Sequence, residues 1–402
     1  MLIETYNIEL IPDADTARYW SQMLDTARNA FNHCAKRLSD AKSPLSLKAV
    51  HSLCYNETRE AFPLLSSQMV IKCEQAAAAA LKSIRSNKHR NAEIPVRKSL
   101  TMLLDKRLYG VLNIDGITLT GPKKGKRVRV PFKLYEKAEH MLRSFKACDP
   151  TLFIRDGRIF LSVPFEVPEK PQANDECVGV DLGMRRLFVT SEGVAYRDRA
   201  YAAKRRSLRY LKSRLKSKGT RSAKRHLVKL SHRECNMSKD ACRRAANALV
   251  GSTGAGIIAM EDLSGIKKKT AKTEGGYHRK RHNNAMSQVP FYTFRKIVEH
   301  KAQLAGKRVE TVSPTYTSQT DCRTDKRDGE RRGRRYVCSD GKVFDSDWNA
   351  AINIGKRSRH PVSNILPIDG RLSFLTGRAQ STAQSPKTLS SHGKPTTSVV
   401  GS

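Results

Sequence analysis

The sequence lacks the features of a membrane or secreted protein. None of its 402 residues lies in an apolar run of about 18 residues, the length that spans a bilayer, and no charged start followed by an apolar segment opens the chain. No segment repeats internally. The nine cysteines are odd in number and scattered, which indicates reduced thiols in a cytosol instead of a disulfide framework. We therefore expect a cytoplasmic protein without membrane contact.

Acidic residues are scarce relative to basic ones, with 38 Asp and Glu against 75 Lys and Arg and a formal net charge of +37. Such an excess repels itself and must be neutralised by a polyanion, so nucleic acid is the expected partner. Residues 201–250 carry 16 Lys and Arg but only two acids. A solvated helix face is the ordinary explanation of a charged run. This imbalance instead favours contact of 201–250, and of the basic loop 265–289, with phosphates.

The hydrophobic pattern predicts an α+β multidomain protein. Residues 2–10 alternate like an opening strand, and apolar residues then recur at helical spacing from Asp13 to about residue 84. Residues 98–168 contain short β-rich runs between glycine turns, which predicts a small barrel or sheet. The polar, proline-bearing residues 168–176 predict a linker.

A second domain is predicted after the linker. Its predicted elements are strands at 178–181, 187–190 and 194–197, basic helical residues at 200–250, a strand at 254–260, a helix at 290–306, a strand at 309–312 and a short helix at 346–354. The residues that follow are rich in Ser, Thr, Pro and Gly, so we expect a disordered tail.

Three acids stand at the ends of predicted elements in this second domain. Asp181 and Glu261 each end a strand of apolar residues, and Asp347 begins a helix. Carboxylate oxygens suit Mg²⁺ or Mn²⁺, and two such ions about 4 Å apart can activate water and stabilise the leaving oxygen in phosphodiester hydrolysis. Because no convincing Ser/His or Cys/His pairing is present, metal-assisted hydrolysis is the predicted chemistry.

Each acid alone has an ordinary structural alternative. Asp181 could be a turn residue or part of an actin-like ATPase phosphate loop, but such an ATPase would need a second glycine-rich Asp loop, which the sequence lacks. Glu261 could cap the turn that follows it, and Asp347 could be an N-cap beside Asp345. The three acids together, in this order, favour the metal site.

Four segments carry a resemblance to a known family. They are GVDLGMRRLFVTSEG (179–193), IIAMEDLSGI (257–266), YTSQT (316–320) and DSDWNAAINI (345–354). In this order they resemble the motifs of the TnpB proteins of bacterial insertion sequences, the OrfB type, which are similar to type V CRISPR nucleases. The resemblance extends over almost the whole chain, because the opening strand and the helix with Phe31 and Asn32 are also similar to the start of the family.

The resemblance implies a particular domain plan. An N-terminal, WED-like β-barrel receives a REC-like helical insertion, and a RuvC domain of RNase H-like α/β fold carries an inserted, degenerate zinc-ribbon-like segment. The implied boundaries are 1–12 and 91–170 for the barrel, 13–90 for the helical recognition domain, 171–176 for the linker, 177–316 and 346–356 for the RuvC domain, 317–345 for the target-nucleic-acid-binding segment and 357–402 for the disordered tail.

The resemblance also implies a function. TnpB proteins hold a guide RNA, read a short DNA motif beside the target, and cut both strands of the double-stranded DNA with one site. By motif, Asp181, Glu261 and Asp347 match the family's catalytic acids, which bind two Mg²⁺ ions. Mn²⁺ is expected to be able to substitute for Mg²⁺. Asp347 is preferred to Asp345 because it lies two residues before Asn349 in the D-x-N-A-A pattern. The implied assembly is a monomer with RNA in a bacterial or archaeal cytoplasm.

One segment departs from the family pattern. The family commonly carries a zinc ribbon of two C-x-x-C pairs before the last acid, whereas this chain has only Cys322 and Cys338 there, with Asp321 and Gly341 at other ligand positions. Two cysteines fall short of the four ligands of a structural zinc. We therefore expect no zinc, and we expect packing and polar contacts to hold residues 317–345.

Three other functions agree with parts of the sequence. An RNA-guided repressor of the same ancestry would bind without cutting, but loss of an acid would favour it and all three acids are present. A cut-and-paste transposase with an Asp-Asp-Glu site would have a different order of acids and no long β-rich N-terminal lobe. A simple basic RNA-binding protein explains the charge but leaves the acids at the element ends unexplained.

Overall fold

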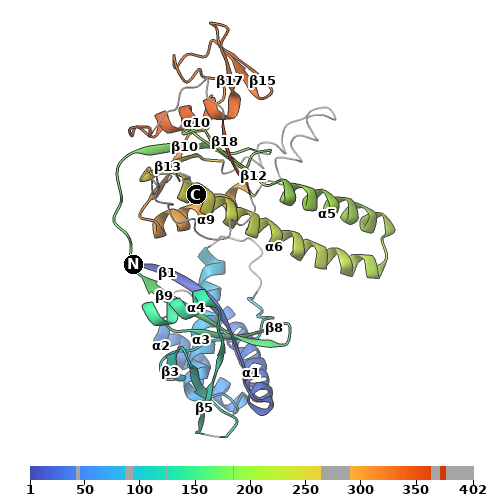
Figure 1. Ribbon diagram of the computed structural model, residues 1–402. Coiled ribbons are helices and arrows are strands. Elements are labelled where there is room, and N and C mark those ends of the chain that lie inside the picture. The colour runs from blue at the N-terminus through green and yellow to red at the C-terminus, as the bar shows by residue number, and fades with distance from the viewer. Residues whose placement is uncertain are drawn as a thin grey trace, which may run out of the picture. The chain divides into compact units, whose positions relative to one another are not determined.

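The structure of the protein is a computed structural model that describes residues 1–41, 46–86, 94–123, 125–183, 185–263, 290–363 and 372–376. The chain divides into two units, residues 1–169 and 170–402 (Figure 1). None of the helices in the described ranges is long and apolar enough to cross a membrane. The basic loop 265–289 lies outside those ranges, so its contact with phosphates stays a prediction.

The first unit combines two antiparallel sheets with helices that follow the first strand. One sheet has the order β2-β8-β9-β1-β6, with β7 paired to β9, and the other has the order β3-β4-β5. The elements are β1 (Leu2–Leu10), α1 (Ala14–Ser39), α2 (Leu47–Ala61), α3 (Ser67–Ser86), β2 (Thr101–Leu103), β3 (Tyr109–Asn113), β4 (Gly116–Thr120), β5 (Arg127–Val130), β6 (Phe132–Lys133), α4 (Glu136–Ser144), β7 (Lys146–Ala147), β8 (Thr151–Arg155) and β9 (Arg158–Val167).

Helix α1 begins where the sequence predicts a helix. The Asp13 carboxylate caps it by accepting a hydrogen bond from the Thr16 amide at 2.8 Å. Its apolar stripe, including Trp20 and Phe31, is buried in the core of the unit. The Trp20 indole also donates to the carbonyl oxygen of Thr120 at 2.8 Å, which fixes α1 to the sheet that contains β4.

The second unit is built on a mixed sheet with the order β14-β13-β10-β11-β12-β18. Only β11 runs against its neighbours, so the carboxyl ends of the other strands meet at one edge of the sheet. The elements are β10 (Cys177–Asp181), β11 (Phe188–Thr190), β12 (Val194–Arg197), α5 (Arg199–Lys218), α6 (Arg221–Ser252), β13 (Ile257–Glu261), α9 (Phe291–Leu304), β14 (Arg308–Val312), β15 (Glu330–Arg332), β16 (Arg335–Val337), β17 (Val343–Asp345), α10 (Ser346–Arg357) and β18 (Ser373–Thr376).

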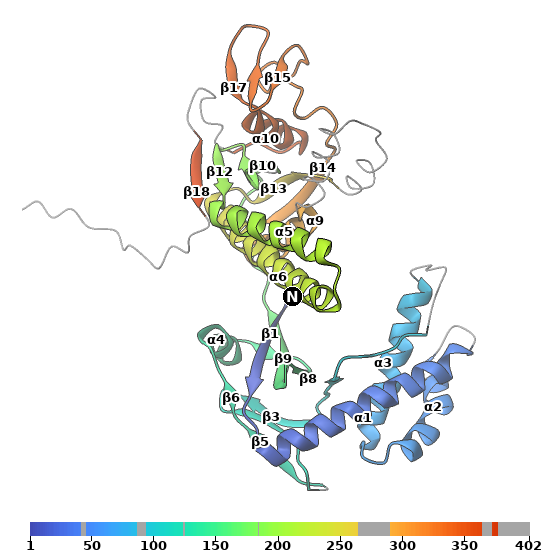
Figure 2. The ribbon, with the colours of Figure 1, turned by 90° about the vertical axis from the view of Figure 1, so that its right-hand side faces the viewer.

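Helices cover both faces of this sheet. α6 and α9 pack on the face formed by Val178 and Val180, whereas α10 packs on the opposite face against Cys177. α5 lies beside α6 in both views of the ribbon and buries none of its own residues (Figures 1 and 2). The strands β15, β16 and β17 form a separate antiparallel sheet next to α10. α10 is therefore the element that joins this small sheet to the main one.

The expectation of a disordered tail from residue 357 is wrong for the described part of that tail. β18 pairs in parallel with β12, with Phe374 opposite Ala195, and Val362 forms a bridge with Cys177. A Ser/Thr-rich composition hides this four-residue strand, because its stability comes from the open edge of β12 and not from its own sequence. Residues 364–371 and 377–402 lie outside the described ranges.

Candidate active site

The strand ends that carry Asp181 and Glu261 lie next to each other. β10 ends at Asp181 and β13 ends at Glu261, and the two strands are parallel neighbours with Val180 opposite Met260. Because adjacent strands are about 4.8 Å apart, both carboxylates lie at the same edge of the sheet. This is the arrangement expected from the sequence for these two acids.

Asp347 reaches this edge because α10 crosses β10 at close range. A Cβ atom added to Gly179 would lie 2.0 Å from the carbonyl oxygen of Ala351 and 2.3 Å from the amide nitrogen of Gly355, so only glycine allows this approach. Gly179 and Asp181 point to the same face of the strand, and Asp347 precedes Ala351 by one helical turn. The first turn of α10 therefore places Asp347 near the end of β10.

The three carboxylates repel one another in a partly buried site. Burial, followed by the charges of Glu261 and Asp347, raises the pKa of Asp181 to about 8. Burial also raises the pKa of Glu261, although a hydrogen bond from the Thr317 hydroxyl opposes this change. A divalent cation would relieve this repulsion, because carboxylate oxygens are the donors that Mg²⁺ and Mn²⁺ prefer. The donor set therefore fits such an ion by its chemistry.

The described residues do not form a closed metal cage. In those ranges no three Asp, Glu, His or Cys side chains are gathered tightly enough to hold an ion by themselves. Two arginines without a predicted role supply positive charge instead. Arg331, on β15, donates to a carboxylate oxygen of Asp347 at 3.2 Å. Its charge also lowers the pKa of Asp181 and Glu261 against the effect of burial.

Arg186 is the second of these arginines. Its side chain is only 6 % exposed, and its two terminal nitrogens bind Asp345 at 2.7 and 2.8 Å. One of them also lies 3.5 Å from Asp347. Burial alone would lower the pKa of Arg186, but Asp345 and then Asp347 raise it. The sequence offers one indication that Arg186 belongs to the site, namely its position five residues after Asp181 in the 179–193 motif. It offers no comparable indication for Arg331.

Asp345 has a role that its place outside the D-x-N spacing does not reveal. Its carboxylate accepts hydrogen bonds from the amides of Asp347 at 3.1 Å and Trp348 at 3.3 Å, which caps α10. The same carboxylate binds Arg186. Asp345 thus fixes the start of the helix that carries Asp347 and holds Arg186 between two carboxylates.

Two buried asparagines of α10 anchor the chain segment that precedes the small sheet. Asn349 accepts from the Cys322 amide at 2.9 Å and donates to the Thr320 carbonyl at 2.7 Å. Asn353 donates to the carbonyls of Thr317 and Thr320 at 2.9 and 2.7 Å. Because the Thr317 hydroxyl donates to Glu261, these bonds connect α10 to the second acid as well. The asparagines of the D-x-N-A-A-I-N pattern therefore position the site.

A polar cluster around Arg323 connects two turns of the 317–345 segment. Arg323 binds the fully buried Asp321 at 3.0 Å and binds Asp340 through contacts of 2.8 and 3.0 Å. Cys322 and Cys338 are buried in different hydrophobic clusters. Burial raises the pKa of Cys322 to about 12 and that of Cys338 to about 11, which disfavours the thiolate that zinc requires.

We expect Arg323→Ala to lower the free energy of unfolding of the second unit, because the buried Asp321 carboxylate loses its cation. The free energy of unfolding would be measured with urea from the fluorescence of Trp348, with Trp20 replaced by Phe. Arg334→Ala is the matched control, since Arg334 is exposed in the turn before β16 and its backbone contact survives the change.

Metal analysis of the purified protein should find well under one zinc per chain. One zinc per chain that is lost in Cys322→Ser or Cys338→Ser would contradict this account of the segment.

Comparisons with known proteins find similarities over parts of the chain. A family model described as Cas12f1-like, TNB domain, matches residues 291–354, a range that includes Asp347. The CRISPR-associated endodeoxyribonuclease Cas12f2 of a Micrarchaeota archaeon is 30 % identical over 237 residues, covering 50 % of this chain and 41 % of the relative. This chain therefore aligns with less than half of that relative's length.

A solved structure extends the comparison to the fold. The structure of a Cas12f1–sgRNA–target DNA complex is 14 % identical, has a TM-score of 0.57, and is matched over 84 % of this chain and 81 % of that one. Together these similarities confirm the resemblance of the chain to TnpB and to the miniature type V nucleases. The chain is an α+β multidomain protein similar in fold to Cas12f1.

Proposed function

We propose that this chain is an RNA-guided DNA endonuclease that cuts through one site built from Asp181, Glu261 and Asp347. The observation that carries the proposal is the convergence of these acids, from two parallel strands and a helix, on one edge of a sheet. The order β14-β13-β10-β11-β12, with only β11 reversed, supports an RNase H-like fold of the RuvC kind. The Cas12f2 relative, named as an endodeoxyribonuclease, supports DNA as the substrate.

The domain plan follows from the same likeness. The two sheets of the first unit would form the WED-like part, and α1, α2 and α3 would form the REC-like recognition part. The 317–345 segment would contact target nucleic acid, because it lies within the matched TNB range and carries Arg331 to the candidate active site.

The residues of the site have separable roles in cutting. The three carboxylates would hold two Mg²⁺ ions, replaceable by Mn²⁺, which when bound activate a water and stabilise the leaving oxygen. Arg331 is 41 % exposed beside Asp347, so its guanidinium can contact a phosphate of the strand to be cut. Thr317 orients Glu261 by donating to its carboxylate. Arg186 and Asp345 hold Asp347 in place from the other side.

The proposed partners are a guide RNA and a double-stranded DNA target beside a short adjacent motif. The net charge of +37 requires extensive neutralisation, and the Cas12f1 complex of similar fold contains an sgRNA and target DNA. In such a protein base pairing with the guide selects the sequence, while the protein reads the adjacent motif. The origin in an insertion sequence and action as a monomer with RNA are part of this proposal.

An RNA-guided repressor that binds without cutting is the alternative. It would keep the guide, the target and the basic surfaces. It would have no need for an Asp181 whose pKa is raised by burial and then by the charges of Glu261 and Asp347. Their presence at one sheet edge favours the endonuclease.

The guided function predicts that one discrete RNA co-purifies with the chain at moderate salt. A structured RNA that covers many basic residues resists salt better than random RNA held by few phosphate contacts. Sequencing of the bound RNA is the measurement. A heterogeneous RNA population that dissociates together with nonspecific DNA as salt rises would contradict guided function.

A further inference from the structure

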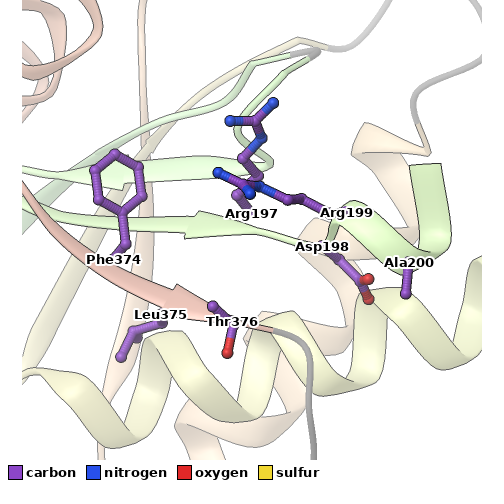
Figure 3. A pocket seen from close by; sticks show the side chains of 7 residues that line it. All are labelled: Arg197, Asp198, Arg199, Ala200, Phe374, Leu375 and Thr376. Carbon is purple, nitrogen blue, oxygen red and sulfur yellow. The ribbon is translucent and has the colours of Figure 1, made fainter. Parts of the chain in front are cut away.

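A cavity of about 690 Å³ lies where β12 and β18 end, and the three carboxylates are not among the described residues that line it. Arg197, Arg199 and Phe374 are among the residues that line it. Figure 3 shows these three side chains on one side of the two strands, whereas Leu375 and Asp198 point to the other side. The cavity therefore combines an aromatic ring with two guanidinium groups on one surface.

The ring of Phe374 is unusually accessible for a large hydrophobic side chain, with 53 % of the residue exposed. Leu372, two residues earlier and thus on the same face of the strand, packs into the cluster that contains Trp348 of α10. Among the residues that the structure describes, Phe374 is not part of that cluster. The side chain is available to stack on a ligand.

Phe374 is connected to the candidate active site through one side chain. The Arg186 guanidinium lies 5.7 Å from the centre of the Phe374 ring and also contacts Asp345 and Asp347. In addition, β10 and β12 run in the same direction on either side of β11, so Asp181 and Arg197 end at the same sheet edge. Two strand spacings, about 10 Å, separate these strands. A single nucleic-acid strand is long enough to contact both places.

The charge around the cavity suits phosphates. Arg197 and Arg199 are exposed, and the nearby Asp198 does not neutralise them, because its carboxylate caps α5 at Tyr201 and pairs with Arg244 at 2.9 Å. α5 continues from the cavity with nine Lys and Arg in 20 residues and no acid. An anionic ligand that follows α5 would therefore enter the cavity along a cationic surface.

We propose that this cavity is a binding subsite for an unpaired stretch of the nucleic-acid strand that occupies the active site. A nucleobase stacks on Phe374, and the neighbouring phosphates contact Arg197 and Arg199. An unpaired strand is specified because only a base released from the helical stack exposes a face to an aromatic side chain. The subsite rests on the proposed function for the identity of the strand, but its chemistry requires only an unpaired nucleic acid.

The first test measures binding of a short single-stranded oligothymidylate to the chain with its co-purified RNA, in an Asp181→Ala background so that nothing is cut. Phe374→Ala is expected to weaken binding about 10-fold without changing its salt dependence, because stacking releases no counterions, and Phe374→Trp is expected to retain the affinity. Arg197→Gln and Arg199→Gln should each reduce the salt slope by about 0.7. Ser373→Ala, on the same strand but facing the opposite way, is the matched control and should change neither quantity.

The second test identifies the contact directly. Oligothymidylate with 5-iodouracil in place of thymine is irradiated on the same complex, and the cross-linked peptide is identified by mass spectrometry. Cross-linking at Phe374 supports the subsite. Equal affinities of the Phe374→Ala and Ser373→Ala proteins, with no cross-link at Phe374, overturn it. An acidic peptide that binds with the same dependence on Phe374, while oligothymidylate does not, also overturns it and assigns the cavity to a protein partner.

The outcomes separate the subsite from the proposed function. If oligothymidylate binding depends on Phe374 but the protein shows no guided cutting, the subsite is supported and the proposed guided endonuclease function is rejected. If guided cutting and oligothymidylate binding are both unchanged in Phe374→Ala, the subsite is rejected and the proposed endonuclease function still holds.

Discussion

Single replacement of Asp181, Glu261 or Asp347 by Ala is expected to abolish Mg²⁺-dependent DNA cleavage while guide-directed binding stays within a few-fold of the wild type. Each carboxylate anchors an ion that two-metal hydrolysis requires, so the loss of one removes water activation or leaving-group stabilisation. Binding comes from phosphate contacts and guide–target pairing, which do not use the acids. Cleavage is measured on gels, and binding by mobility shift, on the same preparations.

Asp262→Asn is the matched control for the first prediction. Asp262 follows Glu261 directly but pairs with Arg295 at 2.9 Å, so its charge faces a different partner and its loss should leave cutting intact. Ca²⁺ in place of Mg²⁺ should support binding with little cutting. If all three alanine variants cut normally, the assignment of the active site is wrong. If the three alanine variants lose both cutting and guide-directed binding, the acids have a structural role, and binding and cleavage are not separable at this site.

Loss of Asp345 is expected to raise the Mg²⁺ concentration for half-maximal cutting about 10-fold, the usual scale for residues that orient metal ligands. In the wild type, Arg186 is shared between Asp345 at 2.7 Å and Asp347 at 3.5 Å. Without Asp345 the buried guanidinium pairs with Asp347 alone and competes with the cation. The measurement is the dependence of the cutting rate on Mg²⁺ concentration for Asp345→Asn, because Asn preserves the helix cap.

Two further variants separate charge from capping. Asp345→Ala should show the same change in Mg²⁺ dependence and also lose about 1 kcal/mol of stability with the cap. In the double variant Arg186→Gln, Asp345→Asn, the competing cation is gone, so the Mg²⁺ dependence should return toward that of the wild type. An unchanged Mg²⁺ dependence in Asp345→Asn would show that Arg186 does not control Asp347.

The acids at the strand ends were predictable because two simple rules converge there. An apolar run that ends in an acid indicates a buried strand with an exposed tip, and parallel strands bring their tips to the same edge. Gly179, inside the first motif, also agrees with the close crossing of α10 that brings in Asp347. For these residues local sequence and tertiary structure point to the same arrangement.

The rest of the site depends on contacts between segments that are distant in the sequence. Arg186 and Asp345 are 159 residues apart, and no local pattern indicates that they form a partly buried ion pair. The same holds for Arg331, which reaches Asp347 from β15, a strand that pairs with β16 in the small sheet. β18 was missed for a related reason, since four residues in a Ser/Thr-rich tail become a strand only when the edge of β12 is available.

The most direct test of the proposed function is cutting by the purified chain–RNA complex when the guide segment of its RNA is changed. A plasmid library with randomised flanks beside a target that matches the guide also reports the adjacent motif. Double-strand cutting is expected to move to the new target, to require Mg²⁺, and to be absent in the Asp181→Ala complex, which still binds that target. Cutting that ignores the guide, or binding without any cutting by the wild-type complex, would contradict the proposed function.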